Sequence, residues 1–120
     1  MRPVTFAASV LSLALIAAPA VAQAFEQITT RDAFVAAVKG RDLTRLGISV
    51  AVSPSGGIEG RAFGYPVTGA WNWQGNYFCR DLYWGGDRLD PNCQAVLIQG
   101  DTIRFTSDKG SGRSADLTLR

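Results

Sequence analysis

The sequence contains no histidine, and its 120 residues include only two cysteines and one methionine. Histidine is the commonest general base in enzymes, the usual partner of a nucleophilic serine and a frequent ligand of transition metals. Its absence removes the most frequent hydrolytic and metal-dependent mechanisms. Two thiols alone cannot close a zinc site. The sequence therefore predicts no catalytic residue, no cofactor and no metal site.

Motifs that hold nucleotides or activate a serine are also missing. The chain has no G-x-G-x-x-G after a strand, no G-K-[ST] phosphate loop and no G-x-S-x-G elbow. Its charge is balanced, with 12 Lys and Arg against 10 Asp and Glu, and the basic residues are spread along the chain. A nucleic-acid binder would have a clustered basic face, so we predict no nucleic-acid partner.

The first 24 residues have the pattern of a secretory signal. Arg2 provides a positive charge, an apolar run extends over residues 4–18, and Pro19 ends it. Ala22-Gln23-Ala24 is a small-x-small pattern, which predicts cleavage after Ala24, with Ala22 as the near alternative. The run is shorter than a membrane span of ~20 residues. We therefore predict a periplasmic or secreted domain over residues 25–120, without stable membrane insertion. A buried N-terminal helix is the alternative.

Both cysteines lie in the exported part of the chain. In an oxidising compartment, an even pair such as Cys79 and Cys93 predicts one disulfide. The loop that it closes has about 15 residues, which corresponds to roughly 3 kcal/mol of stabilisation in the chain-entropy model. The alternative is a pair of free thiols, although their spacing differs from the C-x-x-C of oxidoreductases.

One amphipathic helix is expected near the start of the domain. Thr30 can cap it, and Phe34 and Val38 recur at helical spacing. Gly40 either ends the helix or only weakens it, in which case residues 41–46 form a further turn.

The rest of the domain alternates apolar and small or polar residues between glycine-rich turns, which predicts short strands. Gly75-Asn76 is a two-residue hairpin signal, and its register places Trp73 opposite Phe78. Pro91 places residues 85–92 in a loop. The expected strands cover residues 48–52, 58–63, 67–74, 77–84, 94–99, 102–106 and 115–119.

These elements predict an α+β fold, in which the helix packs on one face of an antiparallel meander sheet of about seven short strands, or plugs one end of it. One disulfide staples the sheet. The sequence pattern does not decide whether the sheet closes into a barrel.

Aromatic residues are concentrated between residues 71 and 84, and alternation places large apolar groups on both faces of this hairpin. One small core need not cover both faces, and exposed aromatics mark interaction sites. Arg80 lies among them and is suited to stacking or to an anionic ligand. The predicted binding residues are Trp71, Trp73, Arg80, Tyr83 and Trp84. The alternative is that nearly all these aromatics are core residues covered by the helix.

Carboxylates offer the remaining route to catalysis. Asp81, Asp87 and Asp90 cluster around the 85–92 loop, and two carboxylates beside one cleft can perform acid–base hydrolysis. Asp87 and Asp90 with Asn92 also have the oxygen ligands that calcium takes. Turn and capping roles are the simpler interpretation. The spacing does not show whether these acids converge.

The runs VTGAWNW (67–73), YFCR (77–80), WG (84–85) and NCQ (92–94) resemble a small exported bacterial family whose role is uncharacterised. The name dihydrodipicolinate reductase is sometimes attached to such proteins. True reductases of that name resemble Rossmann enzymes, with an N-terminal glycine-rich nucleotide loop and a histidine-containing catalytic motif. This chain has neither, so no catalytic residue carries over from them.

The sequence thus favours a non-enzymatic binding or interaction module whose partner is a small ligand or another envelope protein. Two alternatives remain. One is a carboxylate-dependent hydrolase that uses the aspartates named above, and the other is a purely structural envelope protein.

Overall fold

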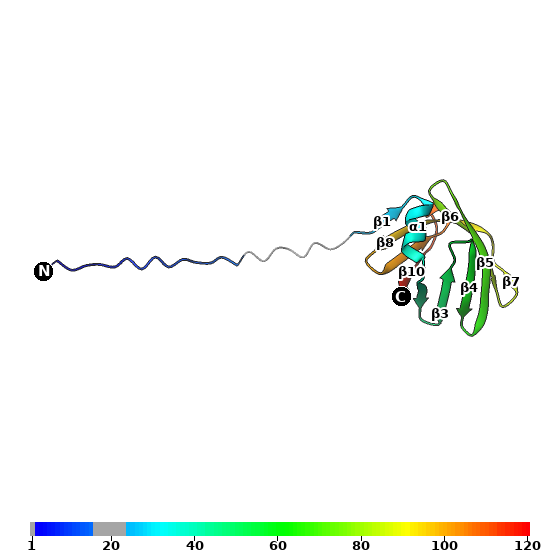
Figure 1. Cartoon of the computed structure of the whole chain (residues 1–120), viewed down its shortest axis with the longest axis horizontal. Helices are drawn as coiled ribbons and strands as arrows, with labels where there is room; N and C mark the ends of the chain where they lie inside the picture. The colour runs from blue at the N-terminus through cyan, green and yellow to red at the C-terminus, as the bar shows by residue number, and fades with distance from the viewer. Residues whose placement is uncertain (1, 16–23) are drawn as a thin grey trace.

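A computed structural model describes residues 2–15 and 24–120 of the chain (Figure 1). Residues 2–15 contain no helix or strand. Pro19 and Ala22 of the expected signal lie outside the described residues. The elements are β1 (Glu26–Ile28), α1 (Arg31–Val38), β2 (Asp42–Arg45), β3 (Ile48–Val52), β4 (Gly57–Ala62), β5 (Tyr65–Gln74), β6 (Tyr77–Trp84), β7 (Asp87–Arg88), β8 (Asn92–Gln99), β9 (Thr102–Thr106), the 3-10 turn η1 (Asp108–Gly110) and β10 (Ser114–Leu119).

The strands form a closed antiparallel barrel. Each barrel strand pairs with the next along the chain in the order β2-β3-β4-β5-β6-β8-β9-β10, and β10 returns to pair with β2. The short strands β1 and β7 extend the wall by pairing with β8 and β6. The predicted α+β class with about seven strands is therefore wrong. The described chain is an eight-stranded barrel with two additional strands and one short helix.

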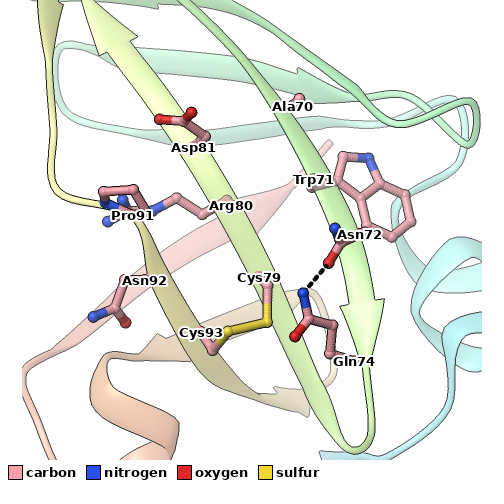
Figure 2. Close-up of a pocket in the computed structure, with 10 residues that line it drawn as sticks. All are labelled: Ala70, Trp71, Asn72, Gln74, Cys79, Arg80, Asp81, Pro91, Asn92 and Cys93. Carbon is pink, nitrogen blue, oxygen red and sulfur yellow. Dashed lines mark hydrogen bonds between the residues drawn. A yellow bond between two sulfur atoms is a disulfide. The ribbon is translucent and has the colours of Figure 1, made fainter.

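Two ladders of the wall are short. β6 and β8 share three residue pairs, centred on Cys79 and Cys93. β10 and β2 share two register pairs, and two backbone hydrogen bonds between Asp42 and Arg120, both 2.9 Å, extend them. The predicted disulfide is confirmed, and it lies in the β6–β8 ladder (Figure 2).

The predicted hairpin at Gly75 is confirmed, with Trp73 opposite Phe78 in the β5–β6 register. Residues 85–92, predicted as a loop, include the short strand β7. Its residues Asp87 and Arg88 pair with Trp84 and Tyr83 of β6. Pro91 itself lies outside the strands, as expected from its missing N–H donor.

Helix α1 begins where the sequence predicts. The side chain of Thr30 accepts a hydrogen bond from the backbone N–H of Ala33, which satisfies one of the free donors of the first turn. The helix ends at Val38, and Gly40 follows with a φ of 68°. The suggested further helical turn over residues 41–46 is wrong. Leu43 instead faces the core from β2, where it pairs with Val50 on one side and Leu119 on the other.

Two glycines let neighbouring strands approach closely in the wall. A Cβ at Gly60 would lie 2.1 Å from the carbonyl oxygen of Ser49, and a Cβ at Gly69 would lie 2.3 Å from that of Asp81. Glycine inside a strand marks such close approaches, which let a sheet curl tightly enough to close.

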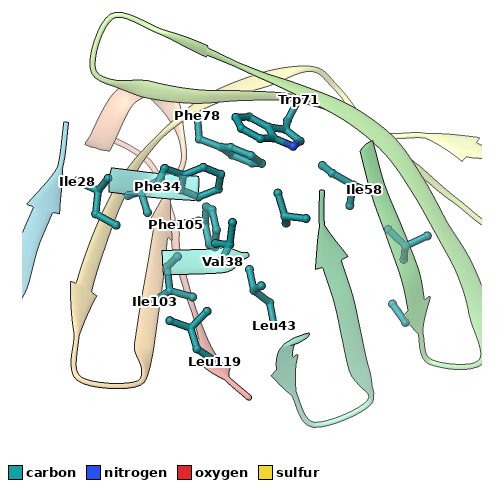
Figure 3. Close-up of a cluster of buried hydrophobic side chains, with 14 residues drawn as sticks. Ile28, Phe34, Val38, Leu43, Ile58, Trp71, Phe78, Ile103, Phe105 and Leu119 are labelled. Atoms are coloured by element: carbon teal, nitrogen blue, oxygen red, sulfur yellow. The ribbon is translucent and has the colours of Figure 1, made fainter. Parts of the chain in front are cut away.

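The helix plugs one end of the barrel (Figure 3). Phe34 and Val38 are fully buried and point from α1 among the inward side chains of the strands. The ring of Phe34 lies 5.1 Å from that of Trp71 and 5.0 Å from that of Phe78, measured between centroids. This plug places the main hydrophobic core at the helix end of the barrel.

Candidate ligand-binding cavity

The inward-facing side chains line a cavity of about 340 Å³ inside the barrel. Every strand of the wall contributes to its lining, from Leu43 of β2 to Leu117 of β10. Successive side chains along each strand point alternately into and out of the barrel. The register aligns the inward-facing residues of neighbouring strands around the ring. The interior is therefore not completely filled by its own side chains.

Four inward-facing aliphatic residues show that this cavity is open to solvent. Ile48, Val50, Leu82 and Leu117 all line it, and each packs against the core yet stays only partly buried. A closed core would cover such side chains completely. Their partial exposure therefore marks the interior surface of an open chamber.

The two ends of the cavity differ. Phe78 and Phe105 belong to its lining and also pack against Phe34 of the helix, with ring centroids 5.0 and 6.4 Å from that ring. They form the floor. At the other end, Phe63 and Leu89 line the opening and are 64% and 40% exposed. The chamber is therefore closed by α1 and open beside the β4–β5 turn.

Arg80 and Gln94 add two polar groups to this apolar lining. They lie on neighbouring strands, two register positions apart, because Arg80 pairs with Asn92 and Phe78 pairs with Gln94. The Nη1 of Arg80 donates to the carbonyl oxygen of Asp90 at 2.6 Å, and the Nε2 of Gln94 donates to the Oγ of Ser107 at 3.3 Å. The two side chains therefore form one polar spot beside the β6–β8 ladder.

Burial sets the electrostatics of Arg80. It lowers the pKa of the guanidinium from its usual value, whereas the nearby charges of Asp81 and Asp90 raise it. Because an arginine titrates so far above neutrality, the side chain stays a cation at neutral pH. The cavity thus holds a partly desolvated positive charge.

No protein-family model, curated protein sequence or solved structure matches this chain. The function therefore has to be argued from the cavity itself. The similarity to a small exported family remains a prediction.

A second hollow of about 350 Å³ lies beside the disulfide (Figure 2). Its lining is more polar and includes Asn72, Gln74 and Asn92 together with both cysteines. Arg80 lines both hollows, so its side chain separates the interior of the barrel from this outer depression.

The residues predicted to bind a ligand are divided between two places. Trp71 and Trp73 face inward beneath the helix, where Trp71 donates its indole N–H to the carbonyl oxygen of Ser53 at 2.8 Å. The buried Nε1 of Trp73 has no hydrogen-bond partner among the described residues. Neither tryptophan is among the lining residues of the cavity.

The other three predicted residues do line the cavity. Arg80 faces it from β6, and Tyr83 and Trp84 lie at the mouth, where they are 39% and 37% exposed. Trp84 also donates its indole N–H to the carbonyl oxygen of Ala62 at 2.8 Å, which fixes the ring across the β4–β5 hairpin. Sequence reasoning missed Phe63, Leu89 and Gln94. An apolar residue beside a turn glycine, as in Phe63-Gly64, was the available signal for the first of them.

Asp81, one of the acidic residues around the 85–92 loop, is paired with a cation. Asp81 points to the outer face of the barrel, where both its oxygens accept from Arg88 at 3.1 Å. This hydrogen bonding holds the pKa of Asp81 below its usual value. A proton donor needs a raised pKa instead. Among the described residues, no group of three or more His, Cys, Asp or Glu side chains is placed to hold a metal ion.

None of the helices in the described part of the chain has the length and apolar character needed to cross a membrane.

Proposed function

We propose that this protein is an exported, non-enzymatic carrier or sensor that binds one small, mainly apolar molecule inside its barrel. The observation that carries the proposal is the open chamber lined by half-buried aliphatic side chains. Barrels of eight strands have an interior that is either filled by side chains or just wide enough for one small ligand. A cavity of about 340 Å³ lies at the lower end of the range of small-molecule sites.

The contact surface that we propose differs from the aromatic sheet face expected from the sequence. Trp71 and Trp73 serve the core beneath α1. The aromatic contacts for a ligand come from Phe63, Tyr83 and Trp84 at the mouth. Large aromatic side chains around the opening can shield an apolar molecule from water while it sits in the chamber.

Export to the periplasm supports this proposal but rests on separate observations. The expected signal over residues 1–24 would direct the chain out of the cytoplasm. The disulfide between Cys79 and Cys93 fits an oxidising compartment. Apolar molecules dissolve poorly in that aqueous space, so a protein that encloses one would keep it in solution.

The test uses 1-decanol as a neutral apolar probe, with binding followed by titration calorimetry on the oxidised protein. We expect saturable one-to-one binding. Val50→Trp places a large ring inside the chamber and should weaken binding by at least about tenfold, or ~1.4 kcal/mol. Ser49→Trp is the matched control, because Ser49 is the preceding residue of β3 and is exposed on the outside.

Two results would overturn the proposal. One is the absence of saturable binding by the unaltered protein, and the other is equal affinity of the Val50→Trp and Ser49→Trp variants. Leu117→Trp fills the same chamber from β10, two strands away from β3 around the wall. It replaces Val50→Trp if that variant does not fold.

A further inference from the structure

We infer that the molecule bound in the chamber carries one negative charge, which pairs with Arg80, on a short apolar chain. This inference rests on the proposed function and names its ligand class: a single-chain anionic amphiphile. The observation that carries it is the placement of one guanidinium, with one carboxamide beside it, in an otherwise apolar lining.

Arg80 is the one charged side chain among the described residues that line the cavity. Its neighbours in the lining are mainly aliphatic and aromatic, and Gln94 adds a carboxamide. In a pocket of this kind, a few polar groups set the orientation and the chemical class of the ligand. A cation at this position selects for an anion.

The hydrogen bonding of Arg80 leaves room for that anion. A guanidinium has five N–H donors, and the bond to Asp90 goes to a neutral backbone carbonyl. Asp81 is the closest acid in the sequence. Both its carboxylate oxygens accept hydrogen bonds from Arg88 on the outer face of the barrel. A carboxylate in the chamber would accept from the planar guanidinium fork, the geometry in which arginine binds carboxylates most strongly.

The lowered pKa of Arg80 reflects partial desolvation of its guanidinium, which the charges of Asp81 and Asp90 only partly offset. An anionic ligand would compensate this charge inside the chamber. Gln94, two register positions away on β8, lines the same chamber, and its Nε2 donates to Ser107.

The volume of the chamber limits the length of the apolar chain. A cavity of about 340 Å³ lies at the lower end of the range of small-molecule sites, which favours a short chain. Decanoate, with ten carbons, is the probe chosen for this range. Longer chains would have to extend through the mouth, between Phe63 and Trp84.

The experiment compares three probes with the same chain and different head groups: decanoate, 1-decanol and decyltrimethylammonium. Titration calorimetry on the oxidised protein gives the dissociation constant of each. We expect decanoate to bind at least about tenfold more tightly than 1-decanol, and the cation to bind most weakly. Arg80→Met should remove the preference for decanoate over 1-decanol, measured as the ratio of their dissociation constants.

Arg61→Met is the matched control. Arg61 also donates from its guanidinium to a turn carbonyl, that of Gly64 at 2.7 Å, but it lies exposed on the outside of β4. We expect the variant to keep the full preference for decanoate. If Arg80→Met does not fold, Arg80→Lys replaces it, and the loss of the planar fork should still reduce the preference.

The possible failures are distinguishable. If 1-decanol binds as tightly as decanoate, or if the cation binds more tightly, the inference about the anion is wrong and the proposed function stands. If none of the three probes binds, the proposed function itself fails. Equal loss of decanoate preference in Arg80→Met and Arg61→Met would assign the effect to overall charge and would also overturn the inference.

Discussion

Cys79 of β6 and Cys93 of β8 are direct register partners, and their disulfide lies in the middle of the three-pair ladder between these strands. By comparison, β5 and β6 share eight register pairs. The covalent bond therefore reinforces a narrow part of the barrel wall. The same ladder contains Arg80 and Gln94 as inward neighbours of the two cysteines, so it supports the polar spot of the cavity as well.

Removing this bond should destabilise the fold. We expect the double variant Cys79→Ser with Cys93→Ser to lose about 3 kcal/mol of unfolding free energy, from the closure of a loop of about 15 residues. Urea denaturation of the oxidised protein, the reduced protein and the double variant measures this loss. Equal melting temperatures with and without reductant would contradict the prediction. Binding of decanoate should also weaken on reduction, because the ladder that holds Arg80 and Gln94 loosens.

The packing of α1 into the end of the barrel should depend on Phe34. This side chain is fully buried and contacts Trp71, Trp73 and Phe78. Phe34→Ala should therefore cost about 3–5 kcal/mol, as is typical of truncating a buried phenylalanine. Leu46→Ala is the control, because Leu46 is 96% exposed and its truncation should change stability by no more than about 0.5 kcal/mol. Comparable losses in the two variants would show that α1 does not form the plug in solution.

Phe63 combines backbone strain with a place at the mouth. Its φ is 51°, in the left-handed region that a phenylalanine rarely adopts, and it lines the cavity. Asparagine tolerates this conformation, so Phe63→Asn should stabilise the fold by about 1 kcal/mol. It should also weaken 1-decanol binding, because an apolar wall is lost. Phe63→Leu is the control that keeps the strain and an apolar side chain. Thermal melts and calorimetry check both effects, and a stabilised variant with unchanged binding would exclude Phe63 from the site.

Asp116 should contribute to the acid sensitivity of the fold. Both its oxygens accept from Arg104, at 2.7 and 3.0 Å, and this hydrogen bonding lowers the pKa of Asp116 from its usual 3.8. A depressed pKa gives stability that is present above the unfolded value and lost as pH falls through the folded one. The unfolding free energy of Asp116→Asn should therefore fall less steeply than that of the unaltered protein below about pH 4.

Arg104→Met should show the same flattened profile, because the guanidinium is the first cause of the lowered pKa. Denaturant titrations at a series of pH values test both variants. Parallel profiles for Asp116→Asn and the unaltered protein would contradict this role of the pair.

The local features of the fold were predictable because short-range chemistry determines them. Thr30 caps a helix, Gly75 makes a turn, and the turn sets Trp73 opposite Phe78. The closure of the sheet was not predictable in this way. It depends on contacts between residues far apart in sequence, such as Leu43 with Leu119, and on the close approaches allowed by Gly60 and Gly69.

The candidate site was predictable only in part for a related reason. Alternation along β6 correctly groups Phe78 and Trp84 on one face, but it does not show which neighbours cover each residue. Trp71 and Trp73 share the inner face of β5 and lie beneath the helix, whereas Trp84 reaches the mouth. That difference arises from the position of each residue along the barrel axis, which no local pattern encodes.

The short ladder between β10 and β2 has a consequence for how copies of this protein interact while they fold. It brings together residues as distant as Thr44 and Thr118, whereas the other ladders between barrel strands join strands that are consecutive or separated only by the short β7. Until β10 docks, the wall is an open sheet with unpaired N–H and C=O groups along two edges. During that interval, β10 of one copy can complete the barrel of another. Concentrated refolding should therefore produce strand-exchanged dimers that dilute refolding avoids.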